Sequence, residues 1–107
     1  MGKTRTRALN VSPAVRKAVY ERDSWEGFPC CVTCGKPGRH SIAHFIAKSQ
    51  GGLAIAENLV NLCHEPCHST FDHGGPGERQ EMEWFIEEYL MKIYPDWDRS
   101  KLVYKRA

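Results

Sequence analysis

Four cysteines arranged in two pairs limit what this chain can fold into. Cys31 and Cys34 are separated by two residues, and Cys63 and Cys67 by three. Both spacings are typical of thiolates that bind a single tetrahedral zinc ion. The chain has 107 residues, enough for one domain with a modest core, and a structural metal stabilises many domains of this size. We therefore expect one structural zinc ion to join the two ends of a compact unit.

Spacing alone leaves the choice of zinc ligands open at two positions. Cys30 stands beside Cys31, and His64 stands beside Cys63. We prefer Cys63 because it directly follows the apolar run 59–62, where the chain is expected to turn, and Cys30 is then a spare thiol. A redox pair or buried cysteines are weaker interpretations, because no βαβ pattern surrounds the first pair. The odd number of cysteines, five, also favours metal binding over disulfides.

Several short motifs stand in a fixed order around these cysteines, at 43–46, 51–52, 57–60, 62–63 and 67–68. Together they resemble the HNH endonucleases of the ββα-metal class, in the subgroup whose motif is supported by a zinc held by four cysteines. The resemblance covers residues 14–73 well and the tail weakly. It implies an α+β fold, with a zinc-stabilised ββα-metal motif and flanking N- and C-terminal helices, and it implies hydrolysis of DNA phosphodiester bonds.

The same resemblance implies a biological setting. Small stand-alone proteins of this kind are common in phages and prophages, and some are implicated in genome packaging alongside terminase. The resemblance therefore implies DNA, and by extension phage terminase, as partners. It also implies a cytoplasmic location in a bacterial or phage-infected cell, and it does not give an oligomeric state.

The resemblance assigns roles to four polar residues. His44, near the end of the first strand, matches the general base that takes a proton from the water attacking a phosphate. Asn58 matches the asparagine that holds the loop and orients that histidine. His68, at the start of the helix, matches the metal-ligand histidine. Asp72 lies one helical turn further on, so both side chains are expected to hold one catalytic divalent ion, Mg²⁺, Mn²⁺ or another.

Ala43 departs from the family pattern. Many members carry an aspartate or a second histidine at this position as a metal ligand, so the catalytic ion is expected to have one protein ligand fewer here. Asp72, His40 or His73 would have to replace it. For this reason the main alternative is a zinc-bound DNA-binding module without cleavage activity, and a third interpretation is a protein-interaction zinc ribbon.

Charge is distributed unevenly along the chain. Residues 1–48 contain nine Lys and Arg against three Asp and Glu, whereas residues 49–107 contain six against ten. We expect the basic half to face phosphates. Residues 1–11 are predicted to be a flexible basic arm along DNA, with a solvated tail as an equally good interpretation. The candidate DNA-binding residues are Lys3, Arg5, Arg7, Arg16 and Lys48.

Residues 12–107 are predicted to form a single HNH nuclease domain, with its core motif at about 30–73. Helices are expected at 12–22, capped by Ser12 and Pro13, and at 66–73, and a strand at 58–62. The glycine-rich run 74–77 is predicted to be a hinge before a C-terminal buttress helix at about 78–93. No apolar run approaches the roughly 18 residues that a membrane span requires.

Apolar side chains predict how these elements pack. Trp25 and Phe28 are expected to lie in the core beside the cysteines, and the last segment to fold back onto the domain. The buttress helix carries acidic residues on one side, which would repel phosphate. Its other side carries a stripe that is expected to face the core, formed by Met82, Phe85, Ile86, Tyr89, Leu90 and Ile93.

Overall fold

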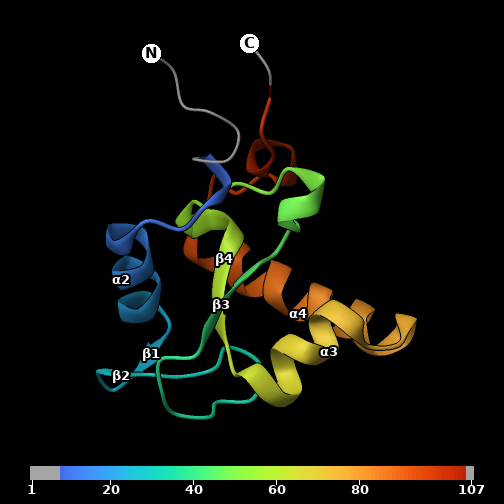
Figure 1. Ribbon diagram of the computed structural model, residues 1–107. Helices are drawn as coiled ribbons and strands as arrows, with labels where there is room; N and C mark the ends of the chain where they lie inside the picture. Colours follow the sequence, from blue (N-terminus) through green and yellow to red (C-terminus); the bar gives the residue numbers. More distant parts are fainter. Residues whose placement is uncertain (1–7, 106–107) are drawn as a thin grey trace.

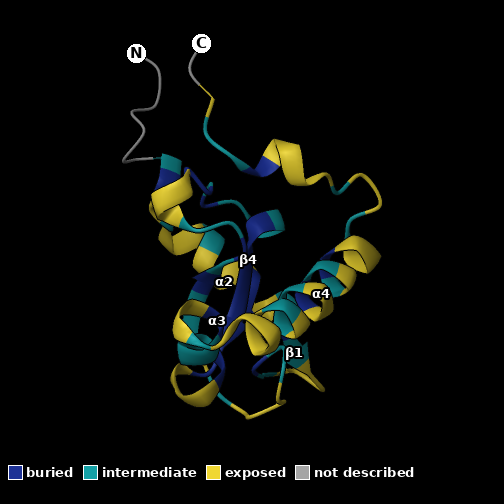
Figure 2. Cartoon of the chain, turned by 90° about the vertical axis from the view of Figure 1, so that its right-hand side faces the viewer, coloured by how far each residue is buried: buried dark blue, intermediate teal, exposed yellow. Residues whose placement is uncertain are grey.

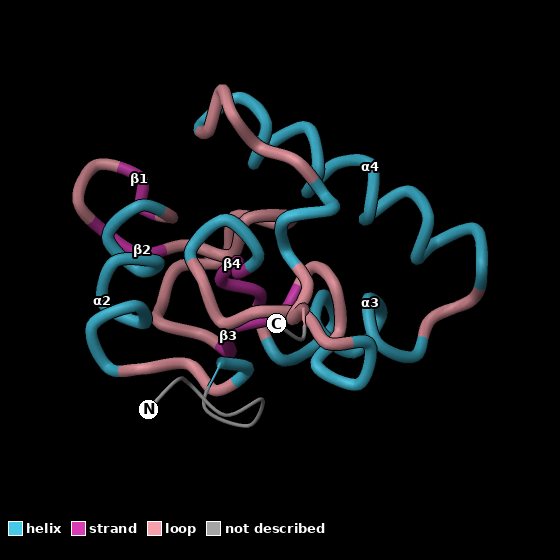
Figure 3. Tube along the Cα trace, turned by 90° about the horizontal axis from the view of Figure 1, so that it is seen from above, coloured by secondary structure: helices cyan, strands magenta, loops and turns pink. Residues whose placement is uncertain are grey.

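A two-stranded antiparallel sheet lies at the centre of the structure, a computed structural model that describes residues 8–105 (Figure 1). Strand β3 (Ser41–His44) pairs with β4 (Leu59–Leu62), so that Ser41 lies opposite Leu62 and His44 opposite Leu59. All four residues of β4 are buried. Helix α2 (Pro13–Arg22) lies on one side of the sheet, and α3 (Ser69–His73) and α4 (Pro76–Ile93) lie on the other (Figure 3). The fold class is α+β, as expected.

Helix α2 begins where the sequence predicts. The Ser12 hydroxyl accepts a hydrogen bond from the backbone N–H of Val15 at 3.2 Å, and Pro13 occupies the first turn. This satisfies one of the backbone donors that a helix start leaves unpaired. The helix buries Val19 and Tyr20 against the sheet.

A short hairpin follows α2, formed by β1 (Ser24–Trp25) and β2 (Phe28–Pro29). Glu26 and Gly27 make its turn with φ angles of 50° and 85°, the positive values that a tight two-residue turn requires. The prediction that Trp25 and Phe28 belong to the core is wrong, because their exposed fractions are 73% and 71%. They pair at the tip of a hairpin that extends away from the central sheet (Figure 1).

The predicted helix 66–73 is divided into an irregular turn, His64–His68, and the short helix α3. The predicted hinge is shorter than expected, because Pro76 and Gly77 already belong to α4. Gly74 has a steric reason to be glycine, since a Cβ there would lie 2.4 Å from the carbonyl oxygen of Thr70.

Helix α4 contributes a narrower stripe to the core than predicted. Ile86 and Leu90 are fully buried, whereas Phe85 and Ile93 are 51% and 37% exposed. Phe85 is rotated by about 100° around the helix from Ile86, and Ile93 is the last helical residue. Strand β4 is coloured as buried in Figure 2. The rest of the core comes from three of the four paired cysteines, the sheet and the residue after β3, helix α3 and the C-terminal segment, with the buried members Cys31, Ala43, Phe45, Val60, Leu62, Cys63, Cys67, Phe71 and Leu102.

The C-terminal segment folds back onto the domain, as predicted. Trp97 packs edge-on against Phe45, with ring centroids 5.6 Å apart. Leu102 is buried, Val103 forms a β-bridge with Gly52, and the N–H of Tyr104 donates to the Gly51 carbonyl at 2.7 Å. Within residues 8–105 no helix is both long and apolar enough to cross a bilayer.

A buried carboxylate joins α2, β4 and α4. Asp23 is 4% exposed and accepts hydrogen bonds from the Arg22 guanidinium, the Tyr89 hydroxyl and the backbone N–H of Asn61. Arg22 also donates to the carbonyl of Leu59. Because each charge is paired and hydrogen-bonded, the cost of burying it is offset. Nothing in the sequence pattern singled out this network.

Candidate metal and catalytic centres

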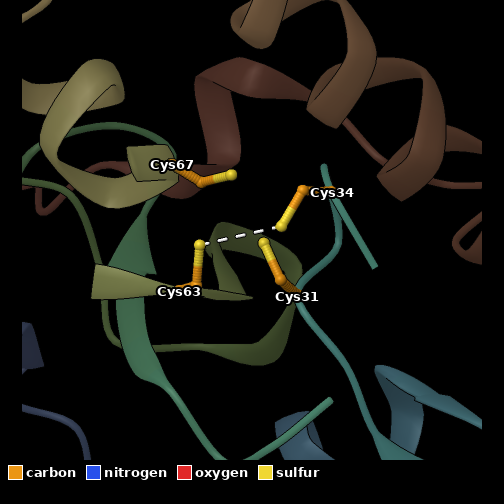
Figure 4. Close-up of side chains that lie close together, drawn as sticks. All are labelled: Cys31, Cys34, Cys63 and Cys67. Carbon is orange, nitrogen blue, oxygen red and sulfur yellow. Dashed lines mark hydrogen bonds between the residues drawn. The ribbon is translucent and has the colours of Figure 1, made fainter. Parts of the chain in front are cut away.

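The four paired cysteines converge at one end of the sheet (Figure 4). Cys31 and Cys34 lie in the loop after β2, Cys63 directly follows β4, and Cys67 lies in the turn before α3. All four sulfur atoms lie within 4.8 Å of one another. Cys30 instead directs its thiol to the Phe28 carbonyl at 3.2 Å, outside this cluster.

The cluster fits a zinc ion. Tetrahedral zinc with Zn–S bonds of about 2.3 Å requires sulfur atoms about 3.8 Å apart. The Sγ atoms of Cys34 and Cys63 are 3.7 Å apart (Figure 4). Cys31, Cys63 and Cys67 are buried and Cys34 is exposed. Four thiolates leave no coordination position for water, as in structural rather than catalytic zinc sites.

The thiols of this cluster differ in acidity. Burial raises the pKa of the Cys31 thiol, but hydrogen bonds from Thr33 and from backbone N–H groups outweigh it and bring the pKa to about 6. Burial, together with the neighbouring thiols, raises the pKa of Cys67 to about 12. Four thiolates therefore require a cation among them, which is what zinc supplies.

Asn61 holds the first cysteine pair in place. Its Nδ2 donates to the carbonyls of Cys30 and Gly38, both at 3.0 Å, and its Oδ1 accepts from the N–H of His40 at 2.9 Å. The N–H of Val32 donates to its backbone carbonyl. Sequence reasoning missed this residue, although an asparagine inside the otherwise apolar strand β4 was a signal that could have found it.

A second site lies beside the other end of β3. His44, His68 and Asp72 line one open pocket of about 590 Å³. His68 and Asp72 are four residues apart on the turn and α3, and their Nε2 and Oδ2 atoms are 3.2 Å apart. Half of the Asp72 side chain is exposed and about a fifth of that of His68. An imidazole and a carboxylate at this spacing suit a divalent cation with further positions open to water or substrate.

His44 is held by a backbone carbonyl from outside the motif. Its Nε2 lies 3.0 Å from the carbonyl oxygen of Leu9, which can only accept, so Nε2 carries the proton and Nδ1 is left as the acceptor. Burial lowers the pKa of His44, the charges of Lys48 and His68 lower it further, and the Leu9 bond opposes them. A neutral imidazole at neutral pH is the form a general base needs. The contribution of Leu9 has no sequence signal.

Asn58 fixes the loop that connects β3 to β4. It is fully buried, accepts from the N–H of Ile46 at 2.8 Å and donates to the carbonyls of Ile46 and Leu53 at 3.2 and 2.9 Å. The N–H of Phe45 donates to its backbone carbonyl at 2.7 Å. The residue directly after His44 is therefore bound to Asn58. Gly52 closes the same loop, because a Cβ there would lie 1.6 Å from the Ile46 carbonyl oxygen.

Ala43 does not line the pocket that contains His44, His68 and Asp72. Its exposed fraction is 1% and it belongs to the hydrophobic core, because successive side chains of a strand point to opposite faces. His40 donates its Nε2–H to the Lys36 carbonyl, and His73 is exposed on α3. Neither lines the pocket, so of the three replacements considered only Asp72 lies in it.

Two of the predicted DNA-binding residues flank this pocket. Arg16 and Lys48 both line it, and Lys48 donates from Nζ to Oδ1 of Asn10 at 2.7 Å. The other three, Lys3, Arg5 and Arg7, lie outside the described residues.

Comparison with known proteins gives one match. Residues 31–73 match the family model described as HNH endonuclease. The matched segment contains both cysteine pairs and the residues His44, Asn58, His68 and Asp72. No curated protein and no solved structure matches the chain.

Proposed function

We propose that this chain, which carries an HNH endonuclease domain at residues 31–73, is a metal-dependent DNA endonuclease that hydrolyses phosphodiester bonds. One observation carries the proposal. His44, with one ring nitrogen already bound to a carbonyl, lines the same pocket as the adjacent His68 and Asp72 side chains. A proton acceptor beside a candidate cation site is the arrangement that phosphodiester hydrolysis needs.

Each residue of the pocket has a separate task in this proposal. Nδ1 of His44 accepts a proton from the attacking water. His68 and Asp72 hold a divalent cation, which when bound supplies positive charge to the phosphate and the leaving oxygen. Arg16 and Lys48 bind the phosphates that flank the scissile bond. Asn58 keeps the loop after His44 in place, which preserves the position of the base.

The main alternative is a DNA-binding module without cleavage activity. It is favoured by Ala43, since the pocket offers the cation only two protein ligands where other family members offer more. Against it stands the orientation of His44, because pure binding does not require a half-buried imidazole with its tautomer set. A phage origin and a terminase partner stay predictions.

Plasmid cleavage tests the proposal. The wild-type protein should nick or linearise supercoiled plasmid in Mg²⁺ or Mn²⁺ and not without added divalent cation. His44→Ala should lower the cleavage rate by about 100-fold or more, because general-base catalysis contributes about 10² to 10⁴. DNA affinity in a gel shift should change little. The matched control is His73→Ala, which removes an exposed histidine of α3 that lies outside the pocket. This variant should cleave normally.

The pH dependence follows from the lowered pKa of His44. Protonation removes the base, so cleavage should fall on the acidic side, and it should do so below pH 6.5, the ordinary imidazole value.

Unchanged cleavage by His44→Ala would remove this residue from the mechanism. DNA binding without cleavage in any divalent cation would favour the binding module.

A further inference from the structure

Three pockets that share lining residues follow one another from the catalytic pocket along α2, and this row of pockets is called the groove. The catalytic pocket shares Val11 and Arg16 with a second pocket, which is also lined by Lys17. The second pocket in turn shares Arg39 with a third pocket of about 910 Å³ at the β1–β2 hairpin. Helix α2 has ten residues and is therefore about 15 Å long. The groove therefore lies beside a helix of about that length.

The groove changes its chemistry along its length. Beside α2 it is cationic, with Arg16, Lys17 and Arg39 on its walls. The Arg39 guanidinium lies 5.7 Å from the ring centroid of Tyr20 and is otherwise exposed. Arg16 and Arg39 offer positive charge to phosphates here, and Lys17 shares its charge with Glu21, 3.9 Å away.

The far end of the groove is aromatic. Trp25 and Phe28 line the third pocket, called the aromatic pocket from here on. They are among the most exposed large apolar side chains of the described residues. Neither ring is needed to fill the core. Exposed rings at the end of a cationic groove are the combination with which proteins bind single-stranded nucleic acid, because every base has a face that can stack.

We propose that the aromatic pocket binds an unpaired base of the DNA whose backbone enters the catalytic pocket. Arg16, Lys17 and Arg39 bind the phosphates between the two points. This inference rests on the proposed nuclease function and narrows its substrate class to DNA with an unpaired segment beside the cleaved bond. At the duplex spacing of 3.4 Å per nucleotide, the length of α2, about 15 Å, corresponds to four or five nucleotides, and to fewer in a stretched strand.

Charge distinguishes this surface from the other exposed apolar surface, on α4. Trp84 is 62% exposed there, but it neighbours Glu83 and Glu88 and would meet phosphates with negative charge. In the aromatic pocket Asp23 is buried and paired with Arg22. Glu26, at the hairpin turn, is the remaining carboxylate of that pocket, and it should weaken DNA binding there.

Binding to two matched DNAs tests the inference. The parent protein is His44→Ala without added divalent cation, which should bind DNA and not cut it during the measurement. The two DNAs are the same duplex with either a blunt end or a forked, single-stranded end. Trp25→Ala should weaken binding of the forked DNA by about tenfold and leave blunt-duplex binding unchanged, because only unpaired bases offer a free face. Trp84→Ala, which removes an exposed tryptophan on α4, is the control and should change neither.

Two charge variants report on the groove itself. Arg39→Ala should weaken forked-DNA binding and reduce the slope of log affinity against log salt by about one, since one phosphate contact is lost. Lys92→Ala, an exposed cation on α4, is its control and should leave the slope unchanged. Glu26→Gln should strengthen binding of the forked DNA.

The outcomes separate this inference from the proposed function. If Trp25→Ala binds both DNAs like its parent while the wild type still cuts plasmid, the unpaired-base site is overturned and the nuclease stands. The aromatic pocket would then suit a protein partner. If the wild type neither binds nor cuts any DNA, both proposals fail together.

Discussion

The cysteine cluster and the histidine pocket are built at opposite ends of the same pair of strands. Cys63 follows β4 directly, at the end where Ser41 pairs with Leu62, whereas His44 ends β3 and pairs with Leu59. The cysteine end is closed, with three of its four ligands buried. The histidine end is open, with half of the Asp72 side chain exposed. A closed set of four ligands suits a structural metal, and an incomplete set suits a reactive one.

The two ends are joined through neighbouring residues. Cys67 belongs to the buried cluster, and the next residue, His68, lines the catalytic pocket. One turn therefore sets the position of a ligand at each end. Loss of a zinc ligand should therefore unfold the turn and displace His68 from the pocket. Loss of a side chain of the pocket should leave the zinc ion bound. Substitutions at the two ends test that asymmetry.

The largest effect is expected from Cys63→Ser. Structural zinc contributes about 10 kcal/mol or more of apparent binding energy, comparable with the whole stability of a small domain. Removal of one buried thiolate ligand should therefore abolish zinc retention and the cooperative thermal transition. Zinc content of the purified protein and circular dichroism on heating would measure both.

Cys30→Ser is the matched control for this prediction, because Cys30 lies beside the cluster without belonging to it. It should keep about one zinc per chain and melt near the wild-type temperature. Equal damage from Cys30→Ser, with little from Cys31→Ser, would show that the ligand set is wrong.

Asn58→Ala should have an intermediate effect. It leaves the N–H of Ile46 and the carbonyl of Leu53 without their partners inside the protein. An unsatisfied buried polar group costs about 1–3 kcal/mol, so unfolding in urea should show a loss of about 2 kcal/mol or more. Zinc should stay bound, because Asn58 is at the histidine end.

Asn10→Ala is the control for that change. Among the described residues, the Asn10 side chain has one hydrogen bond, which it accepts from the exposed Lys48. Its free energy of unfolding should stay within about 0.5 kcal/mol of the wild type. If Asn58→Ala were as stable as Asn10→Ala, the loop would not depend on the asparagine.

The sequence predicted those parts of the two ends that depend on local patterns. The cysteine spacing, the Ser12 cap and the position of Asn58 between loop and strand are readable because spacing and side-chain type determine them. Leu9 and Asp23 were missed because their partners are distant in sequence. The Leu9 carbonyl is 35 positions away from His44 in the sequence, and no pattern within the motif indicates that the two are in contact.

The predictions for the aromatic side chains were wrong for a different reason. Composition indicates that tryptophan and phenylalanine are apolar, but it does not say whether a neighbouring element covers them. The hairpin carrying Trp25 and Phe28 turns within two residues and extends past the core, so nothing covers them in the described structure. Phe85 fits the apolar periodicity of its helix but lies outside the narrow stripe that is covered.

The smallest effect is expected from Asp72→Ala, which removes one oxygen ligand from the open end. Folding and zinc content should stay normal, because the side chain is half exposed and lies outside the cysteine cluster. The concentration of Mg²⁺ or Mn²⁺ needed for half-maximal cleavage should rise, since the remaining shell depends on His68, water and DNA phosphate. His68→Ala should abolish cleavage.

Ala43→Asp sharpens this last prediction, because it adds the acid that many HNH endonucleases carry at the matching position. If its side chain reached the pocket, it would lower the metal requirement. Ala43 instead lies in the core at 1% exposure, so the added carboxylate should be buried without a partner and destabilise the domain. A metal titration in which Asp72→Ala matches the wild type would exclude Asp72 as a ligand. A lower requirement for divalent cation in Ala43→Asp would show that residue 43 can turn its side chain toward His68. The strand register, which pairs Ala43 with Val60 and directs its side chain into the core, would then not hold in the variant.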